Sequence, residues 1–158
     1  MYPIRRILTS TDFSELSKPA FEVACSLARD YGAELIVCHV SPWPVAGVVE
    51  GITVEIPTGS LEETEGQLLQ MLPEDSKVKV SHRLERGEAS AEILKVAAET
   101  KADLIVMGTH GRGGLSRLLI GSVTEDVMRK APCPVLTVKS PAPTERPRPT
   151  AGKQLVTA

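Results

Sequence analysis

The sequence has little of three features that identify common protein classes. Its 158 residues contain only three cysteines, Cys25, Cys38 and Cys133, at wide spacing, so neither a disulfide framework nor a zinc-binding pattern fits. The 18 lysines and arginines nearly balance 20 aspartates and glutamates, which excludes the strong basic field of a nucleic-acid-binding protein. No apolar run is long enough to span a bilayer, and residues 1–6 lead into a short strand rather than a signal-peptide core. We therefore expect a cytoplasmic protein whose thiols are buried.

The features that are present are typical of a single α/β domain. Hydrophobic residues make up 42% and charged residues 24% of a chain long enough to bury one core. Short apolar runs alternate with segments of helical periodicity, which favours a doubly wound parallel sheet of five strands. The predicted strands are residues 5–12, 34–40, 77–85, 103–107 and 134–138, with a candidate short strand at 52–56 in an irregular connection. The predicted helices are residues 17–31, 60–72, 89–100 and 122–130.

Periodicity also assigns an inward face to each predicted helix. Ser14 or Ser17 can cap the first helix, and Ser17 is favoured because Pro19 is tolerated only near a helix start. Gly32 suits the C-terminal end of this helix. Trp43, the only tryptophan, is expected to cover the edge of the core, and His39 to be a hydrogen-bonded structural residue within its strand. The residues expected to face the core are Phe21, Ala24, Leu27, Ala28, Tyr31, Leu61, Leu68, Leu69, Leu72, Ile93, Leu94, Ala97, Ala98, Val123, Val127 and Met128.

The chain is organised around the glycine-rich segment 108–123, which directly follows the apolar run 103–107. Glycine lets a loop turn with positive φ and brings backbone N–H groups against an anion. A helix that begins after Gly121 adds unpaired N–H donors and the positive end of its dipole, and the Ser122 hydroxyl adds another donor. The spacing matches neither a Walker A loop nor the dinucleotide-binding fingerprint. The segment predicts a phosphate site, and the simpler alternative is a connection whose glycines only make turns.

The glycine spacing also resembles a known family. The nucleotide-binding signature of the universal stress protein family is similar to Gly108-x2-Gly111-x9-Gly121-Ser122. Residues 122–138 resemble the end of that family's domain, and the whole resemblance covers about residues 4–139. It implies one domain over residues 1–139, followed by a Pro-rich C-terminal tail at 140–158. The implied fold is adenine-nucleotide alpha-hydrolase-like, a single doubly wound five-stranded parallel sheet in the order 3-2-1-4-5 with helices on both faces.

The resemblance implies a nucleotide site of the ATP-binding branch, with ATP and Mg²⁺ as cofactors. The matching residues are Ser10, Thr11, Asp12 and Val40 at the adenosine end, and Gly108, Gly111, Gly121, Ser122 and Val123 at the ribose and phosphates. The set is completed by Met107, Thr109, Arg112 and Gly113. Asp12 is expected to bond the nucleotide or to help hold Mg²⁺ through water, and the alternative is a solvated aspartate at a helix entry. Arg112 is expected to assist the phosphates without being essential, and Ser10 stands where that branch often has proline.

Other functions of the same pocket stay open at this point. An enzyme would use it for ATP hydrolysis or phosphoryl transfer, but the nucleophile elbow and the loop of the related ATP pyrophosphatases are absent, so we assign no catalytic residue and expect slow hydrolysis at most. An adaptor would bind cyclic AMP or no nucleotide. The resemblance implies a homodimer paired through the edge strand 135–138. The alternative is a monomer whose tail covers that edge.

Overall fold

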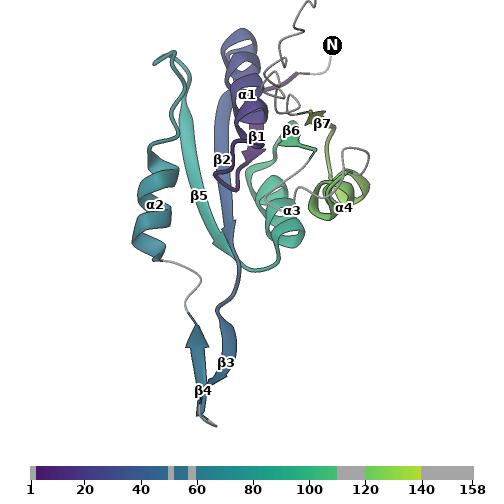
Figure 1. The fold of residues 1–158 in the computed structure, drawn as a ribbon. Coiled ribbons are helices and arrows are strands. Elements are labelled where there is room, and N and C mark those ends of the chain that lie inside the picture. The colour runs from purple at the N-terminus through teal and green to yellow at the C-terminus, as the bar shows by residue number, and fades with distance from the viewer. Residues whose placement is uncertain (1–2, 50–51, 57–59, 110–119, 140–158) are drawn as a thin grey trace, which may run out of the picture.

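A five-stranded parallel sheet forms the centre of the molecule. The structure, a computed structural model, describes residues 3–49, 52–56, 60–109 and 120–139. The strands of the sheet are β1 (Arg6–Ser10), β2 (Glu34–Ser41), β5 (Val80–Arg86), β6 (Leu104–Gly108) and β7 (Val135–Val138). They pair in the order β5-β2-β1-β6-β7, every pair parallel (Figure 1). Counted along the chain this is the order 3-2-1-4-5, so the predicted fold class is confirmed, with β5 and β7 at the two edges.

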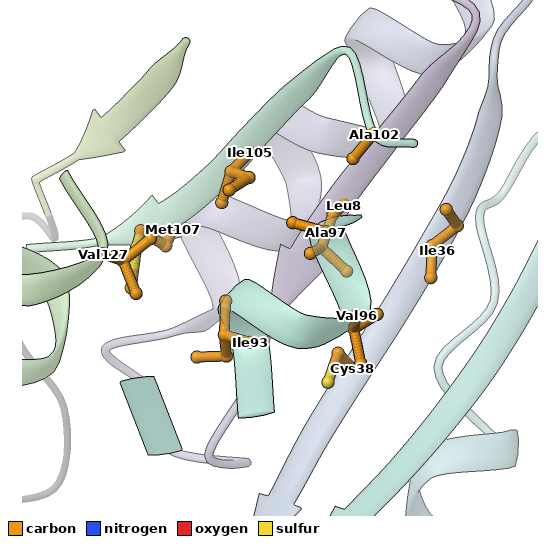
Figure 2. Close-up of a cluster of buried hydrophobic side chains, with 10 residues drawn as sticks. All are labelled: Leu8, Ile36, Cys38, Ile93, Val96, Ala97, Ala102, Ile105, Met107 and Val127. Atoms are coloured by element: carbon orange, nitrogen blue, oxygen red, sulfur yellow. The ribbon is translucent and has the colours of Figure 1, made fainter. Parts of the chain in front are cut away.

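Helices cover both faces of this sheet. In the described part of the chain they are α1 (Lys18–Tyr31), α2 (Leu61–Leu69), α3 (Ala89–Thr100) and α4 (Ser122–Lys130). None of these helices is long and apolar enough to cross a membrane. Successive residues of β1 point to opposite faces, so Ile7 packs in the cluster with α1 and α2, whereas Leu8 packs with α3 and α4. Figure 2 shows this second cluster, which extends from Ile36 on β2 to Val127 on α4.

The ends of α1, α3 and α4 lie at or next to the predicted residues. α3 and α4 have the predicted bounds, and α1 begins after Ser17 as expected. The Ser17 hydroxyl makes no capping hydrogen bond, however, and it donates to the carbonyl oxygen of Ser14 at 2.9 Å. Gly32 ends α1 with φ at +61°, a left-handed conformation that glycine adopts without steric cost.

The predicted inward face of α2 was largely wrong. Leu68 is buried, but Leu61, Leu69 and Leu72 are 43%, 53% and 57% exposed. The helix also ends at Leu69, earlier than the predicted Leu72. The exposed leucines lie at the ends of the helix or beyond it, because Leu61 is its first residue, Leu69 its last, and Leu72 follows it.

The predicted inward face of α3 missed the buried Val96 and included the exposed Ala98, and that of α4 included the exposed Met128. The buried stripe of α3 is Ile93, Val96 and Ala97, at the i, i+3, i+4 spacing of one helix face, and Ala98 is exposed. In α4, Met128 is likewise exposed because it follows the buried Val127 and is turned away from the sheet. Tyr31 of α1 is exposed because it is the last residue of its helix.

A small antiparallel hairpin stands apart from the main sheet. It consists of β3 (Val45–Val49) and β4 (Ile52–Ile56), and Figure 1 shows it extending away from the domain. The sequence suggested the second of these strands but not the first. Trp43, which precedes the hairpin, is 63% exposed, so its predicted role at the edge of the core is wrong. Its ring lies 6.0 Å from the guanidinium carbon of Arg86, a cation–π contact.

The three cysteines are free, and their burial suppresses ionisation. Cys38 is fully buried, and desolvation raises its pKa to about 12. Cys25 and Cys133 are half-buried, and desolvation raises the pKa of Cys25 to about 11 and also raises that of Cys133. The expectation of buried thiols therefore holds fully for Cys38 and in part for the other two.

Candidate functional site

The candidate site lies where the strand order reverses, at the carboxyl ends of β1 and β6. These two strands are neighbours, with Thr9 opposite Val106. The chain therefore leaves the sheet at two adjacent points, as Ser10 to Asp12 on one side and as Gly108 and Thr109 on the other. Crevices of this kind are where open α/β sheets bind ligands. The two segments that the sequence assigned to one site do converge, although about 100 residues separate them along the chain.

The start of α4 is tied directly to the end of β6. The N–H of Gly121 donates to the Thr109 carbonyl oxygen at 2.8 Å, and the Thr109 N–H donates to the Val138 carbonyl oxygen on β7 at 3.0 Å. The Thr124 hydroxyl donates to the carbonyl oxygen of Gly108 at 2.8 Å. Two of these hydrogen bonds, from Gly121 and Thr124, thus fix the first turn of α4 at the end of β6, and the third joins that end to β7.

This fixed helix end has the chemistry of an anion site. Gly121 is the N-cap residue and has no side chain with which to accept the first N–H groups of α4. Those N–H groups and the positive end of the helix dipole therefore lie close to Thr109 at the end of β6, together with the exposed residue Ser122. Gly121 has φ −60° and ψ 145°, a conformation open to any residue. Glycine is therefore not required here by the backbone torsions.

The turn between β1 and α1 is held by a network of short hydrogen bonds. The Thr11 N–H donates to the Cys38 carbonyl oxygen at 2.9 Å. The only hydroxyl hydrogen of Ser17 goes to Ser14, so Thr11 is the donor in the 3.1 Å contact between the Thr11 and Ser17 hydroxyls. The Asp12 carboxylate accepts from the N–H and the hydroxyl of Ser14 through one oxygen, at 3.0 and 2.6 Å. Asp12 therefore shapes the turn itself.

The remaining predicted site residues differ in how their side chains lie. Met107 is 3% exposed and belongs to the core cluster of Figure 2, so its side chain is not accessible to a ligand. Thr109 is also buried, whereas Ser10, Val40 and Val123 are half-buried. The predicted site residues that lie outside the described residues are Gly111, Arg112 and Gly113.

A pocket that the sequence did not predict lies beside the start of α4. Its volume is about 300 Å³, and it is lined by Glu88, Ser90, Ser122, Val123, Glu125, Asp126 and Arg129. The Ser90 hydroxyl lies 2.8 Å from carboxylate oxygens of both Glu88 and Asp126, and so links α3 to α4. The N–H groups of Ser90 and Ala91 lower the pKa of Glu88, and Lys130 and then Ser90 lower the pKa of Asp126. Both carboxylates are therefore ionised at neutral pH. The sequence signal that could have pointed to this pocket was Glu88, which directly precedes α3 and caps its first N–H groups.

Comparison with known proteins identifies the family. A profile of the universal stress protein family matches residues 3–139. The chain belongs to the universal stress protein family. Among curated universal stress proteins, MJ0531 of Methanocaldococcus jannaschii is 37% identical over 142 residues, which cover 87% of this chain and 83% of the relative. MJ0577 of the same organism is 31% identical over 155 residues.

Solved structures of universal stress proteins agree with the fold. The structure of MJ0577 has a TM-score of 0.63 to this chain and covers 89% of this chain and 99% of its own. A universal stress protein in complex with cAMP has a TM-score of 0.65 at 22% identity, over 87% of this chain and 98% of that chain. The universal stress protein from Archaeoglobus fulgidus in complex with dAMP has a TM-score of 0.62 at 22% identity, over 88% and 100%.

Proposed function

We propose that this universal stress protein binds ATP with Mg²⁺ at the carboxyl ends of β1 and β6, and that it acts as a nucleotide-dependent signalling protein in the stress response. The observation that carries the proposal is the start of α4. Gly121 leaves the first N–H groups of the helix without a side-chain cap, and its hydrogen bond to Thr109 holds them at the crevice. This arrangement favours a phosphate group.

The nucleotide extends from this helix end toward β1 and β2. The phosphates and ribose lie against Gly108, Gly121, Ser122 and Val123, with Gly111, Arg112 and Gly113 in the connecting segment. The adenosine end lies against Ser10, Thr11, Asp12 and Val40. The parallel pairing of β1 with both β2 and β6 supports this direction, because it brings the two groups of residues together at the carboxyl ends of the strands.

Magnesium enters with the phosphates rather than at a site built by the protein. Among the described residues, no group of three or more histidine, cysteine, aspartate or glutamate side chains could hold a metal ion. The pocket beside Ser122 carries Glu88, Glu125 and Asp126 against one arginine. A triphosphate next to these carboxylates is disfavoured unless a cation offsets its charge, and Mg²⁺ is the usual partner of nucleotide phosphates. Asp12 would contact such an ion through water.

The nucleotide can be identified without any assumption about its identity. Purified protein is denatured, and the released small molecules are analysed by mass spectrometry. We expect ATP; the solved relatives with cAMP and dAMP make these the main competing ligands. Recovery of cAMP or AMP would retain the site and change the ligand. No adenine nucleotide, together with no ATP binding by calorimetry, would contradict the proposal and favour an adaptor.

We also propose that the protein forms a homodimer through β7. This strand lies at the edge of the sheet, and its Leu136 is 39% exposed. The strand contains no proline or charged residue between Val135 and Val138 that would block pairing with another chain. Two such edges would meet antiparallel across a two-fold axis.

A further inference from the structure

One histidine on β2 contacts the turn that follows β1. His39 Nδ1 lies 2.8 Å from the carbonyl oxygen of Thr11. A carbonyl oxygen can only accept a hydrogen bond, so Nδ1 must carry the hydrogen and donate it. The bond joins β2 to the turn that follows β1. Both lie at the carboxyl ends of the parallel strands, which is where the candidate site lies.

The same imidazole ring also packs on Phe13. The two ring centroids are 4.3 Å apart and the planes are tilted by 31°. Phe13 has φ at +61°, a left-handed conformation that a bulky residue rarely adopts. Its N–H donates to the Thr11 hydroxyl at 3.0 Å. Surrounding contacts are needed to keep such a conformation, and His39 supplies two of them.

These contacts lie on both sides of Asp12. His39 holds the carbonyl group of the preceding residue, Thr11, and the ring of the following residue, Phe13. The residues before and after Asp12 are therefore both held by the His39 side chain of β2. We name this arrangement of His39, Thr11 and Phe13 the His39 clasp.

We propose that His39 is a positioning residue for nucleotide binding, because the clasp fixes the backbone of Thr11 and Asp12 at the adenosine end of the site. The inference rests on the proposed function. It assigns His39 no contact with the ligand and no role in proton transfer. The clasp acts by keeping the turn in its binding conformation before the nucleotide arrives, so that binding does not have to order it.

Two amide substitutions separate the donor from the bulk of the ring. Asparagine places its side-chain N–H₂ near the position of Nδ1 and can still donate to Thr11, whereas glutamine places it one bond farther, near Nε2. We expect His39→Gln to weaken ATP binding about tenfold in calorimetry with Mg²⁺ present, and His39→Asn to recover most of that loss. A role in packing alone would not favour the smaller amide.

His82 provides a matched control. Its Nε2 lies 3.0 Å from the carbonyl oxygen of Met71, so it makes the same kind of bond on the edge strand β5, away from the candidate site. The bonded atom of His82 is Nε2 rather than Nδ1, so at this position glutamine keeps the hydrogen bond and asparagine loses it. His82→Asn is expected to leave the ATP affinity within about twofold of the parent.

Amide hydrogen exchange tests the clasp in the absence of nucleotide. The N–H groups of Phe13 and Ser14 bond within the turn, and we expect their exchange in His39→Gln to accelerate about tenfold while Ala24 in α1 is unchanged. Unchanged exchange, or unchanged ATP affinity in His39→Gln, would overturn the inference. A parent protein that binds no adenine nucleotide would instead overturn the proposed function and the effect on affinity, and the exchange rates would still decide whether the clasp exists.

Discussion

Two buried threonines differ in the hydrogen bonds of their hydroxyl groups. Thr9 on β1 is 1% exposed, and its hydroxyl has no hydrogen-bond partner within the described residues. Thr124 on α4 is 4% exposed and donates to the Gly108 carbonyl oxygen. A buried hydroxyl without a partner costs free energy, whereas a bonded one stabilises the fold modestly.

Replacing each threonine by valine, which has a similar shape, should therefore have opposite effects. We expect Thr9→Val to raise the free energy of unfolding by about 1 kcal/mol and Thr124→Val to lower it by about 1–2 kcal/mol. Urea unfolding followed by circular dichroism measures both values. A loss of stability in Thr9→Val would mean that its hydroxyl has a partner, such as a buried water.

The parts of the candidate site that depend on the course of the backbone could be predicted from the sequence. The parts that depend on side-chain contacts were harder to predict. The convergence of Ser10–Asp12 with Gly108 and Gly121 followed from the strand order that the family resemblance implied, because the carboxyl ends of neighbouring parallel strands lie side by side. The network around Asp12 could be suspected from Asp-x-Ser, which often forms a turn. The left-handed conformation of Phe13 could not be predicted, because it depends on a contact with His39 of β2.

At the scale of the elements, local sequence signals predicted the first and last residues of the helices better than the side of each helix that faces the core. α3 begins at its predicted residue because the Glu88 carboxylate caps the first N–H groups of the helix. α4 ends at its predicted residue because Ala131 precedes Pro132, and a residue before proline disfavours the helical conformation. The leucines of α2 were assigned to the core because periodicity shows that a helix has an apolar side, but not how much sheet lies beneath it. The strand Val45–Val49 was missed because its proline- and glycine-containing surroundings indicate an irregular loop.

Two glycines allow a test of the helix ends. Gly32 needs φ +61° at the end of α1, whereas Gly66 lies inside α2, and an added Cβ would meet nothing within 4 Å at either position. Gly32→Ala should lower the free energy of unfolding by about 1 kcal/mol because alanine is strained at this φ. Gly66→Ala should raise it by about 0.5–1 kcal/mol through helix propensity. Thermal unfolding compares them, and a neutral Gly32→Ala would show that α1 can end differently.

For the whole molecule, the main prediction concerns assembly through β7. The proposed division into a domain at 1–139 and a tail at 140–158 makes truncation after Lys139 informative. An edge-paired dimer should stay a dimer without the tail, since the pairing surface is β7 itself. Light scattering on full-length and truncated protein measures this. A full-length monomer that dimerises only when shortened would show that the tail covers the edge.

The central claim is that nucleotide phosphates bind at the start of α4, and one substitution tests it most directly. Gly121 has backbone torsions that valine can adopt, so Gly121→Val should fold while placing a side chain where the phosphates approach. Gly66→Val is the matched control on α2. Calorimetry with ATP and Mg²⁺ should show binding by the parent and by Gly66→Val, and a loss of at least about tenfold in Gly121→Val. Binding of ATP by Gly121→Val as tight as by the parent would contradict the account.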